Sequence, residues 1–185
     1  MEIKNLIDED FVNYKKPSMF IGFSKCNFKC DKECGERVCQ NSELATAPNV
    51  EFENPGEIVI RYYQNPITEA VVFGGLEPFD SYEDLTQLLS LFACGSQSGY
   101  ADKKGMPDIV IYTGYYPEEI MEKLAPYNVL TSFGGDFIIK FGRFIPRRPH
   151  KFDELLGVEL ASDNQYSMRL KDVIELSWRK NGIVS

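Results

Sequence analysis

Four of the five cysteines in this chain lie within fourteen residues of one another, namely Cys26, Cys30, Cys34 and Cys39. A packed core does not need several thiols on one short segment, and thiolates this close together repel one another unless a metal ion shares their charge. Clustered cysteines in a reducing compartment are more often metal ligands or redox groups than a disulfide framework. The spacing therefore predicts that residues 24–42 form a loop that binds an inorganic group.

Two kinds of inorganic group are compatible with such a loop. Structural zinc sites usually combine two Cys-x2-Cys motifs that are separated by a dozen or more residues. Here the gaps between successive cysteines are three, three and four residues, so all four zinc ligands would come from one tight loop. An iron–sulfur cluster is larger and is commonly held by closely spaced cysteines. The spacing favours a cluster, and a non-catalytic zinc module that uses all four cysteines stays as the alternative.

The cysteine segment resembles the cluster loop of the radical S-adenosylmethionine (SAM) superfamily, in which Cys-x3-Cys is followed by a third cysteine. Cys26 and Cys30 match the first half, and Cys39, which precedes Gln40-Asn41, is similar to the third cysteine of the activating enzymes in this family. The chain departs from the family in the eight residues between Cys30 and Cys39, where the family usually has two. The resemblance implies a 4Fe-4S cluster on Cys26, Cys30 and Cys39, with Cys34 in the longer segment as a competing third ligand.

A second motif follows about forty residues later. The run from Phe73 to Phe79, Phe-Gly-Gly-Leu-Glu-Pro-Phe, resembles the Gly-Gly-Glu-Pro turn of the family with one inserted leucine. Paired glycines let the main chain approach a ligand without a side chain in the way. The resemblance implies that Gly74, Gly75 and Glu77 belong to the SAM site, with Glu77 ordering the turn rather than acting as an acid or base.

Three shorter pieces extend the resemblance as far as residue 165. Thr113-Gly114-Tyr115 resembles the Thr-Gly-Tyr segment of the activating enzymes, and 161–165, Ala-Ser-Asp-Asn-Gln, is similar to their Gly-Ser-Ser-Asn-Gln motif. Residues 140–144 lie where the family has an Asp-Gly-x-Phe step, but Lys140 replaces the usual Asp. The resemblance therefore adds Thr113 and Asn164 as SAM contacts, and it transfers no acidic role to Lys140.

The activity that the resemblance implies is radical chemistry. Three protein thiolates leave one iron of the cluster open to the amino and carboxylate groups of SAM, and the reduced cluster cleaves SAM to a 5′-deoxyadenosyl radical. The chain most resembles the activating proteins of anaerobic ribonucleoside-triphosphate reductases, oxidoreductases that take an electron from a flavodoxin-type donor and form a glycyl radical on the large partner enzyme. A radical SAM enzyme that acts on a small molecule is the nearest alternative.

Composition limits the class of protein. The chain has 185 residues, of which 43% are hydrophobic, and a formal net charge of -8. These values are typical of one globular domain, which we expect to span residues 1–185. The negative charge argues against nucleic acid as the main partner, because phosphate binding requires a surplus of Lys and Arg. We find neither a membrane-span pattern nor a signal-peptide pattern, and we expect a cytoplasmic protein with no membrane partner.

One basic segment, residues 140–151, is conspicuous in this acidic chain. Its basic residues are Lys140, Arg143, Arg147, Arg148, His150 and Lys151. Such a segment is either a solvated loop or a docking surface for an acidic partner or for the carboxylate of SAM. The sequence does not choose between these possibilities, and it predicts the structure of residues 140–185 less clearly than that of the rest.

The elements that position these motifs follow from the pattern of apolar residues. Buried strands are predicted at 18–23, 70–73 and 108–113, with further strand candidates at Val129 and 137–141. Helices are predicted at 56–64, 81–92 and 117–124. Strands that alternate with helices predict an α/β fold with mainly parallel strands, and the family resemblance implies an incomplete (β/α) barrel. The cysteine loop and the turns at Gly74-Gly75 and Thr113-Gly114 would then meet at the carboxyl ends of the strands.

Overall fold

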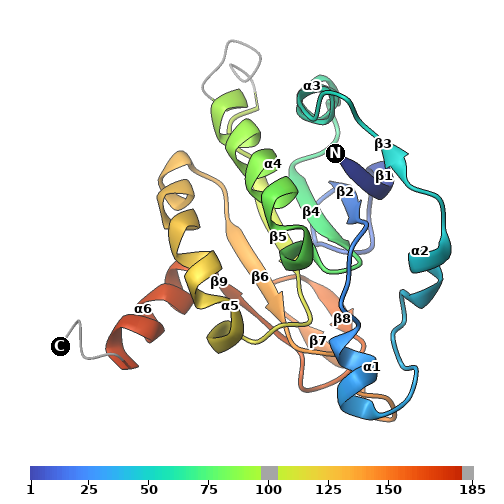
Figure 1. Cartoon of the computed structure of the whole chain (residues 1–185). Helices are drawn as coiled ribbons and strands as arrows, with labels where there is room; N and C mark the ends of the chain where they lie inside the picture. The colour runs from blue at the N-terminus through green and yellow to red at the C-terminus, as the bar shows by residue number, and fades with distance from the viewer. Residues whose placement is uncertain (97–103, 181–185) are drawn as a thin grey trace.

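A seven-stranded sheet forms the centre of the computed structural model, which describes residues 1–96 and 104–180 (Figure 1). Its strands are β1 (Glu2–Asp10), β2 (Ser18–Phe23), β3 (Val50–Glu51), β4 (Ala70–Gly75), β5 (Asp108–Tyr112), β6 (Phe137–Phe141) and β9 (Tyr166–Arg169). Across the sheet the order is β3-β1-β2-β4-β5-β6-β9. The strands β2, β4, β5 and β6 are parallel, and the outer strands pair antiparallel to their neighbours. The predicted α/β class with a mostly parallel central sheet is confirmed.

Helices cover one face of the sheet. They are α3 (Gly56–Gln64), α4 (Tyr82–Gly95), α5 (Pro117–Leu124) and α6 (Leu170–Lys180), with the 3₁₀ helices η1 (Pro78–Ser81) and η2 (Ala125–Phe133). Strand β4 shows why the sheet is buried on both faces, because its side chains alternate between two cores. Val71 and Phe73 pack in the core that contains residues of α3, α4, α5 and α6, whereas Ala70 and Val72 pack on the opposite face.

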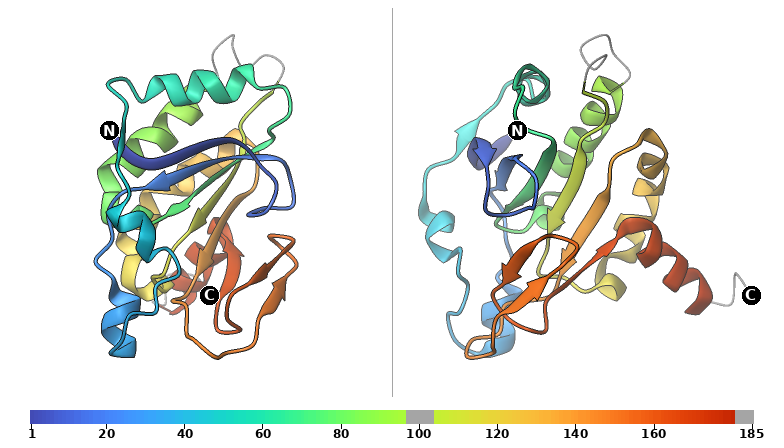
Figure 2. Two further views of the ribbon diagram at one scale, coloured as in Figure 1. Left: turned by 90° about the vertical axis from the view of Figure 1, so that its right-hand side faces the viewer. Right: turned by 180° about the vertical axis from the view of Figure 1, so that it is seen from behind.

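A hairpin packs against this opposite face. It consists of β7 (Lys151–Asp153) and β8 (Val158–Leu160), which pair antiparallel. Leu156 and Leu160 of the hairpin join Val72, Val110 and Ile138 of the sheet in a smaller apolar cluster. Seen from behind, the hairpin lies in front of the sheet, on the side away from α4 and α5 (Figure 2). Residues of β8 therefore lie near the carboxyl ends of the central strands.

Two short helices lie in the segment between β2 and α3. They are α1 (Lys29–Cys34) and α2 (Ser42–Thr46), and neither contains a buried residue. Tertiary contacts and loop hydrogen bonds must hold them, because helices this short are not stable alone. Within the described ranges, no helix has both the length and the apolar character needed to cross a membrane.

Some elements differ from the sequence prediction. Val129 is not in a strand but in η2, with 62% of its side chain exposed, so that prediction was wrong. Strand β1 and helix α6 were not predicted, since β1 ends in acidic residues and α6 presents only a narrow apolar face, Leu170, Val173 and Ile174. The polar, glycine-rich composition of 94–107 predicts a loop, and residues 97–103 of that segment lie outside the described ranges.

Candidate functional site

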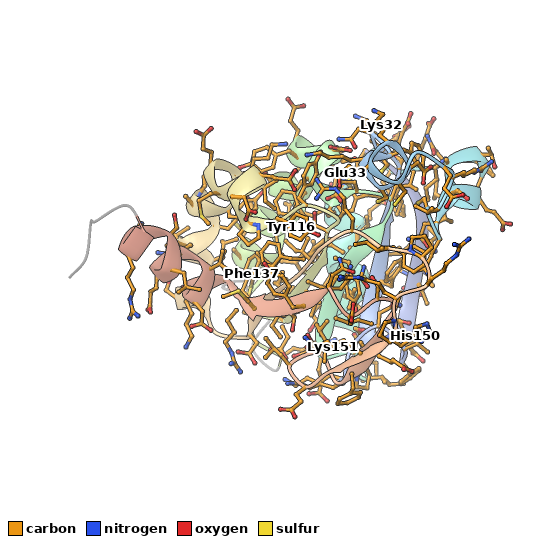
Figure 3. The ribbon with its side chains drawn as sticks, turned by 90° about the horizontal axis from the view of Figure 1, so that it is seen from below. Lys32, Glu33, Tyr116, Phe137, His150 and Lys151 are labelled. Carbon is orange, nitrogen blue, oxygen red and sulfur yellow. The ribbon has the colours of Figure 1, made fainter. Side chains whose placement is uncertain are left out.

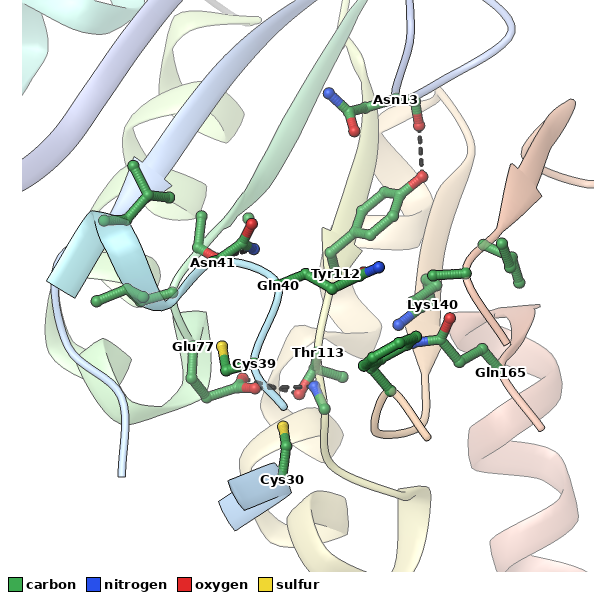
Figure 4. A pocket seen from close by; sticks show the side chains of 18 of the residues that line it. Asn13, Cys30, Cys39, Gln40, Asn41, Glu77, Tyr112, Thr113, Lys140 and Gln165 are labelled. Carbon is green, nitrogen blue, oxygen red and sulfur yellow. Dashed lines mark hydrogen bonds between the residues drawn. The ribbon is translucent and has the colours of Figure 1, made fainter. Parts of the chain in front are cut away.

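A cavity of about 470 Å³ lies at the carboxyl ends of β2, β4 and β5 (Figure 4). Most residues singled out in the sequence line it: Cys26, Cys30, Cys39, Gly74, Gly75, Glu77 and Thr113. The opposite wall comes from the end of β6 and from the β7–β8 hairpin, through residues such as Lys140 and Leu160. The structure thus brings together three loops that are up to 87 residues apart in the chain, from Cys26 to Thr113.

The three cysteines in the cavity are placed by hydrogen bonds of their own loop. Phe28 adopts a left-handed conformation with φ of 52°, and its backbone N–H donates to Cys26 Sγ at 3.2 Å. The chain then forms α1, which carries Cys30 and is followed by Gly35 as its C-cap, with φ of 71°. The Asp31 carboxylate accepts hydrogen bonds from the backbone N–H groups of Val38 (2.9 Å) and Cys39 (2.8 Å). Asp31 therefore fixes the return of the chain that brings Cys39 back beside Cys30.

Asp31 should matter for the retention of any metal group, although its side chain does not line the cavity. In an Asp31→Ala variant, the N–H groups of Val38 and Cys39 lose their acceptor, and Cys39 is no longer held in place. Because groups that orient metal ligands typically contribute about tenfold to a hundredfold in metal affinity, we expect iron to be lost at least about tenfold faster to a chelator. A Glu36→Ala variant, which removes an exposed carboxylate on the same loop, is the matched control. Equal iron retention in both variants would contradict the positioning role.

Cys34 lies elsewhere. It is the last residue of α1, its side chain is exposed, and it does not line the cavity. Cys26, Cys30 and Cys39 are each partly buried. The structure therefore groups the cysteines as three and one, and the three are the set that the sequence resemblance preferred.

Burial makes the three cavity thiols poor acids. Burial raises the pKa of Cys26 to about 12, and it also raises the pKa of Cys30 and of Cys39. Nearby carboxylates also raise these pKa values, and so do the charge of Cys30 on Cys26 and that of Cys39 on Cys30. Backbone N–H groups oppose the shift, and Arg37 opposes it for Cys39. A bound cation would have to displace the thiol protons, as is usual for thiolate sites.

The three cavity thiols are donors of the type and number that an iron–sulfur cluster with one open iron would need. Among the described residues, no group of three or more His, Cys, Asp or Glu side chains is arranged to hold a metal ion. A single zinc ion would need every sulfur at about 2.3 Å, in a tight tetrahedron. A cluster would contribute its own iron and sulfide and would join thiols that lie farther apart.

Glu77 connects the turns that follow β4 and β5. Its carboxylate accepts hydrogen bonds from the Phe79 N–H (3.1 Å), the Thr113 hydroxyl (2.8 Å) and the Gly114 N–H (2.8 Å). Complete burial raises its pKa to about 7, although these three hydrogen bonds oppose the shift. Both carboxylate oxygens are thus occupied by the protein, and Glu77 orders the two turns. The Thr113 hydroxyl is directed to Glu77 and not to the centre of the cavity (Figure 4).

The Gly74-Gly75 turn is joined to the cysteine loop. The Asn41 side chain donates a hydrogen bond from Nδ2 to the Gly75 carbonyl at 2.6 Å. Gly75 has φ of 79°, and an added Cβ would lie 2.7 Å from Gly22 Cα, so only glycine fits here. Both members of the pair Gln40-Asn41 that follows Cys39 line the cavity, and Asn41 also holds the turn.

In the motif 161–165, the side chain that lines the cavity is Gln165, whereas the sequence predicted Asn164. Asn164 does not line the cavity, and its Nδ2 donates to the Arg143 carbonyl at 2.8 Å. The next residue, Gln165, does line the cavity and donates to the Gly142 carbonyl at 3.1 Å. Sequence reasoning missed Gln165 and Lys140 as lining residues, although both lie within motifs that it had identified.

The basic segment 140–151 divides into two parts. Lys140 and Arg143 are buried, with exposed fractions of 7% and 5%. The other four basic residues are exposed, and Figure 3 shows His150 and Lys151 at the surface near the hairpin, away from Lys32 and Glu33 of α1. Arg148 lies 3.2 Å from Asp163, and His150 lies 3.6 Å from Glu159. The exposed part is thus partly neutralised, and its use as a docking surface for an acidic partner stays a prediction.

Glu119 of α5 anchors α1 through a polar network. It accepts hydrogen bonds from Arg143 Nη2 at 2.6 and 2.8 Å and from the Lys29 ammonium group. Arg143 Nε also lies 3.1 Å from a carboxylate oxygen of Glu33. Burial alone would raise the pKa of Glu119, but Arg143 and Lys29 outweigh it and lower the pKa to about 2.

This network should make stability depend on pH. Because the pKa of Glu119 falls on folding from 4.5 to about 2, its stabilisation is complete above about pH 4.5 and is lost as the pH falls towards 2. We expect Glu119→Gln to lower the free energy of unfolding at pH 7 by about 1 kcal/mol, since solvent screens ion pairs near the surface. The difference from the unaltered chain should shrink below pH 4.5, as measured by urea unfolding across this range. Glu118→Gln, at the exposed neighbouring position, should show no such pH-dependent difference.

Comparisons with known proteins add no relative. No protein-family model, curated protein or solved structure matches this chain significantly. The function must therefore be argued from the site.

Proposed function

We propose that this chain is a radical SAM enzyme with an incomplete (β/α) barrel, which holds a 4Fe-4S cluster on Cys26, Cys30 and Cys39. One observation carries the proposal: these three cysteines and the Gly-Gly-x-Glu-Pro turn line the same cavity, while Cys34 does not. The two motifs are far apart in the sequence, at 26–39 and 74–78. They converge at the carboxyl ends of parallel strands, which is where α/β folds bind ligands.

Cys26, Cys30 and Cys39 would hold the cluster, which would supply the electron for the reductive cleavage of SAM. The protein's own residues position and shield this chemistry. Gly74 and Gly75 present main chain without side chains to the ligand, and Asn41 keeps the turn against the cysteine loop. Glu77 joins the turn after β4 to the turn after β5 through its hydrogen bonds with Thr113 and Gly114.

A protein substrate accounts best for the size of the cavity. Ligand sites usually have volumes of about 300–1,000 Å³, and this one has about 470 Å³. A cofactor the size of SAM would fill most of that volume and leave little room for a second small molecule. We therefore propose that the radical is passed to a glycine of a large partner enzyme, an anaerobic ribonucleotide reductase, with electrons from a flavodoxin-type donor. The exposed basic residues of the segment 140–151 offer a surface for an acidic partner, namely Arg147, Arg148, His150 and Lys151.

Anaerobic reconstitution with iron and sulfide tests the cofactor. The proposal expects about four iron and four sulfide ions per chain and a broad absorption near about 400 nm. With a strong reductant, the loaded protein should cleave SAM to methionine and 5′-deoxyadenosine. Bound zinc without visible absorption would instead support the zinc module and refute the proposal.

Partner activation is tested separately. Co-expression with an anaerobic ribonucleotide reductase from a matching source should give a glycyl-radical signal in electron spin resonance. The signal should disappear when Cys30 is replaced by serine. SAM cleavage without a signal on any reductase would favour a small-molecule substrate and leave only the superfamily assignment.

A further inference from the structure

A groove of about 760 Å³ lies between helices α5 and α6. It shares no lining residue with the cavity at the cysteines, so the proposed site does not use it. Residues 117–123 of α5 form one wall, and Val173 and Leu176 of α6 belong to the other. Strand β9 adds Tyr166 and Met168 to the lining. The groove therefore combines apolar side chains from three elements.

The apolar stripe of α6 continues beyond the core. Val173 and Ile174 are buried, whereas Leu176 and Trp178, further along the helix, are 47% and 41% exposed. Trp178 lies four residues after Ile174, on the same face of the helix. Figures 1 and 2 show this end of α6 projecting away from the sheet and from α5. Large apolar side chains that are exposed beside an apolar groove are typical of an interaction surface.

The two helices that border the groove carry unpaired charges of opposite sign. Glu118 and Glu122 line it from α5, four residues apart and thus on one face of that helix. On α6, Arg179 is exposed. Within the part of the chain that the structure describes, none of these three residues has an ion-pair partner within 4 Å. Helix α5 thus offers an acidic wall, and the end of α6 offers a cation.

We propose that the groove between α5 and α6 is occupied by α6 of a second copy of this chain. In a two-fold symmetric pair, both copies use the same patch, which must therefore be complementary to itself. This patch meets that requirement. Each α6 brings Leu176, Trp178 and Arg179, and each groove brings an apolar lining with Glu118 and Glu122 on its wall.

Charge and position favour a second copy over a different protein. An occupant of the groove must combine apolar side chains with a positive charge, because the unpaired side chains on the α5 wall are acidic. The end of α6 has this combination in Leu176, Trp178 and Arg179, and its exposure leaves it free to enter the groove of another copy. The inference concerns a surface outside the cavity, so it does not rest on the proposed function.

Trp178 supplies a direct readout, because it is the only tryptophan in the chain. Sedimentation and tryptophan emission are measured over a dilution series of the 185-residue chain. A thiol reductant is present, so that disulfides between the exposed Cys34 or Cys94 of two copies do not imitate association. We expect a monomer–dimer equilibrium, and the emission should shift to the blue with the same dissociation constant, since the indole leaves water in the dimer.

A Leu176→Glu variant should weaken the dimer at least about tenfold, because it places an acidic group where an apolar side chain would be buried. Its tryptophan emission should stay that of an exposed indole over the dilution series. Ile67→Glu is the matched control, since Ile67 is 46% exposed in a segment that does not line the groove. This control should dimerise like the unaltered chain.

Charge reversal tests the ionic contact separately. Arg179→Glu should weaken the dimer at least about tenfold, because it brings like charges together at the acidic wall. Adding Glu118→Lys and Glu122→Lys to the same chain should restore the affinity to within about threefold. Adding Glu51→Lys and Glu53→Lys instead gives the same net charge at the other edge of the sheet, beside β3, and should restore nothing.

Three results would overturn the inference. The first is a chain that sediments as a monomer throughout the dilution series. The second is a dimer that Leu176→Glu leaves as tight as before, since such a dimer would use another surface. The third is equal recovery with lysines at 118 and 122 and with lysines at 51 and 53, which would reduce the ionic contact to an effect of net charge. A dimer that is weakened by Arg179→Glu and restored only by reversal on α5 supports it.

Discussion

Replacing Cys30 by serine should leave almost no iron on the protein after anaerobic reconstitution, and the same result is expected for Cys26 and Cys39. Each of these thiols lines the cavity, and a three-cysteine site has no spare ligand that could compensate for a loss. A Cys34→Ser variant should instead take up as much iron as the unaltered chain, because Cys34 is exposed on α1 outside the cavity. Iron and sulfide analysis, together with the absorption near about 400 nm, measures the difference.

This set of variants has its control built in, because Cys34 lies between the proposed ligands in the sequence. Serine is close in size to cysteine, so a loss of iron reports the lost thiolate and not a cavity. If Cys34→Ser lost its iron while Cys39→Ser kept it, the ligand set would be Cys26, Cys30 and Cys34. If all four variants lost their metal and that metal were zinc, the zinc module would be correct.

A Gly75→Ala variant should be destabilised by about 3–5 kcal/mol, the sum of backbone strain and overpacking. Gly75 has φ of 79°, and an added Cβ would lie 2.7 Å from Gly22 Cα and 3.0 Å from Phe23 N. Both atoms belong to the main chain of β2, which is held in register by β4 and cannot move aside as a side chain would. Urea unfolding of the cluster-free protein measures the loss directly.

A Gly35→Ala variant separates the effect of backbone strain from the effect of overpacking. Gly35 has a similar φ of 71°, but an added Cβ would have no atom within 4 Å. Its replacement should therefore show only the strain of the left-handed conformation, about 1–2 kcal/mol. Equal losses for the two variants would mean that contact with β2 is unimportant and that the Gly74-Gly75 turn can relax. A larger loss for Gly75→Ala would place the turn and β2 in one rigid unit.

Most central elements could be predicted from the sequence because their signals are local. The runs that form β2, β4, β5 and β6 are mostly apolar, as is typical of parallel strands buried on both faces. Helix α5 starts at Pro117, α3 directly follows Pro55, and α4 has a clear helical period. The prediction failed at Val129, where one apolar residue in a turn has no periodicity to interpret. It also missed α6, because the apolar residues of α6 are confined to the narrow face that packs against the core beside β9.

The sequence by itself determined that thiols, a glycine turn and a Thr-Gly step follow successive parallel strands, and hence that they converge. Tertiary structure decided which members face the cavity. Asp31 brings Cys39, and not Cys34, to the cavity, through hydrogen bonds to two N–H groups seven and eight residues away. Likewise, the spacing of basic residues did not distinguish Lys140 from Lys151. Alternation along a strand fixes which residues share a face, but only the packing of the β7–β8 hairpin decides which face encloses a cavity.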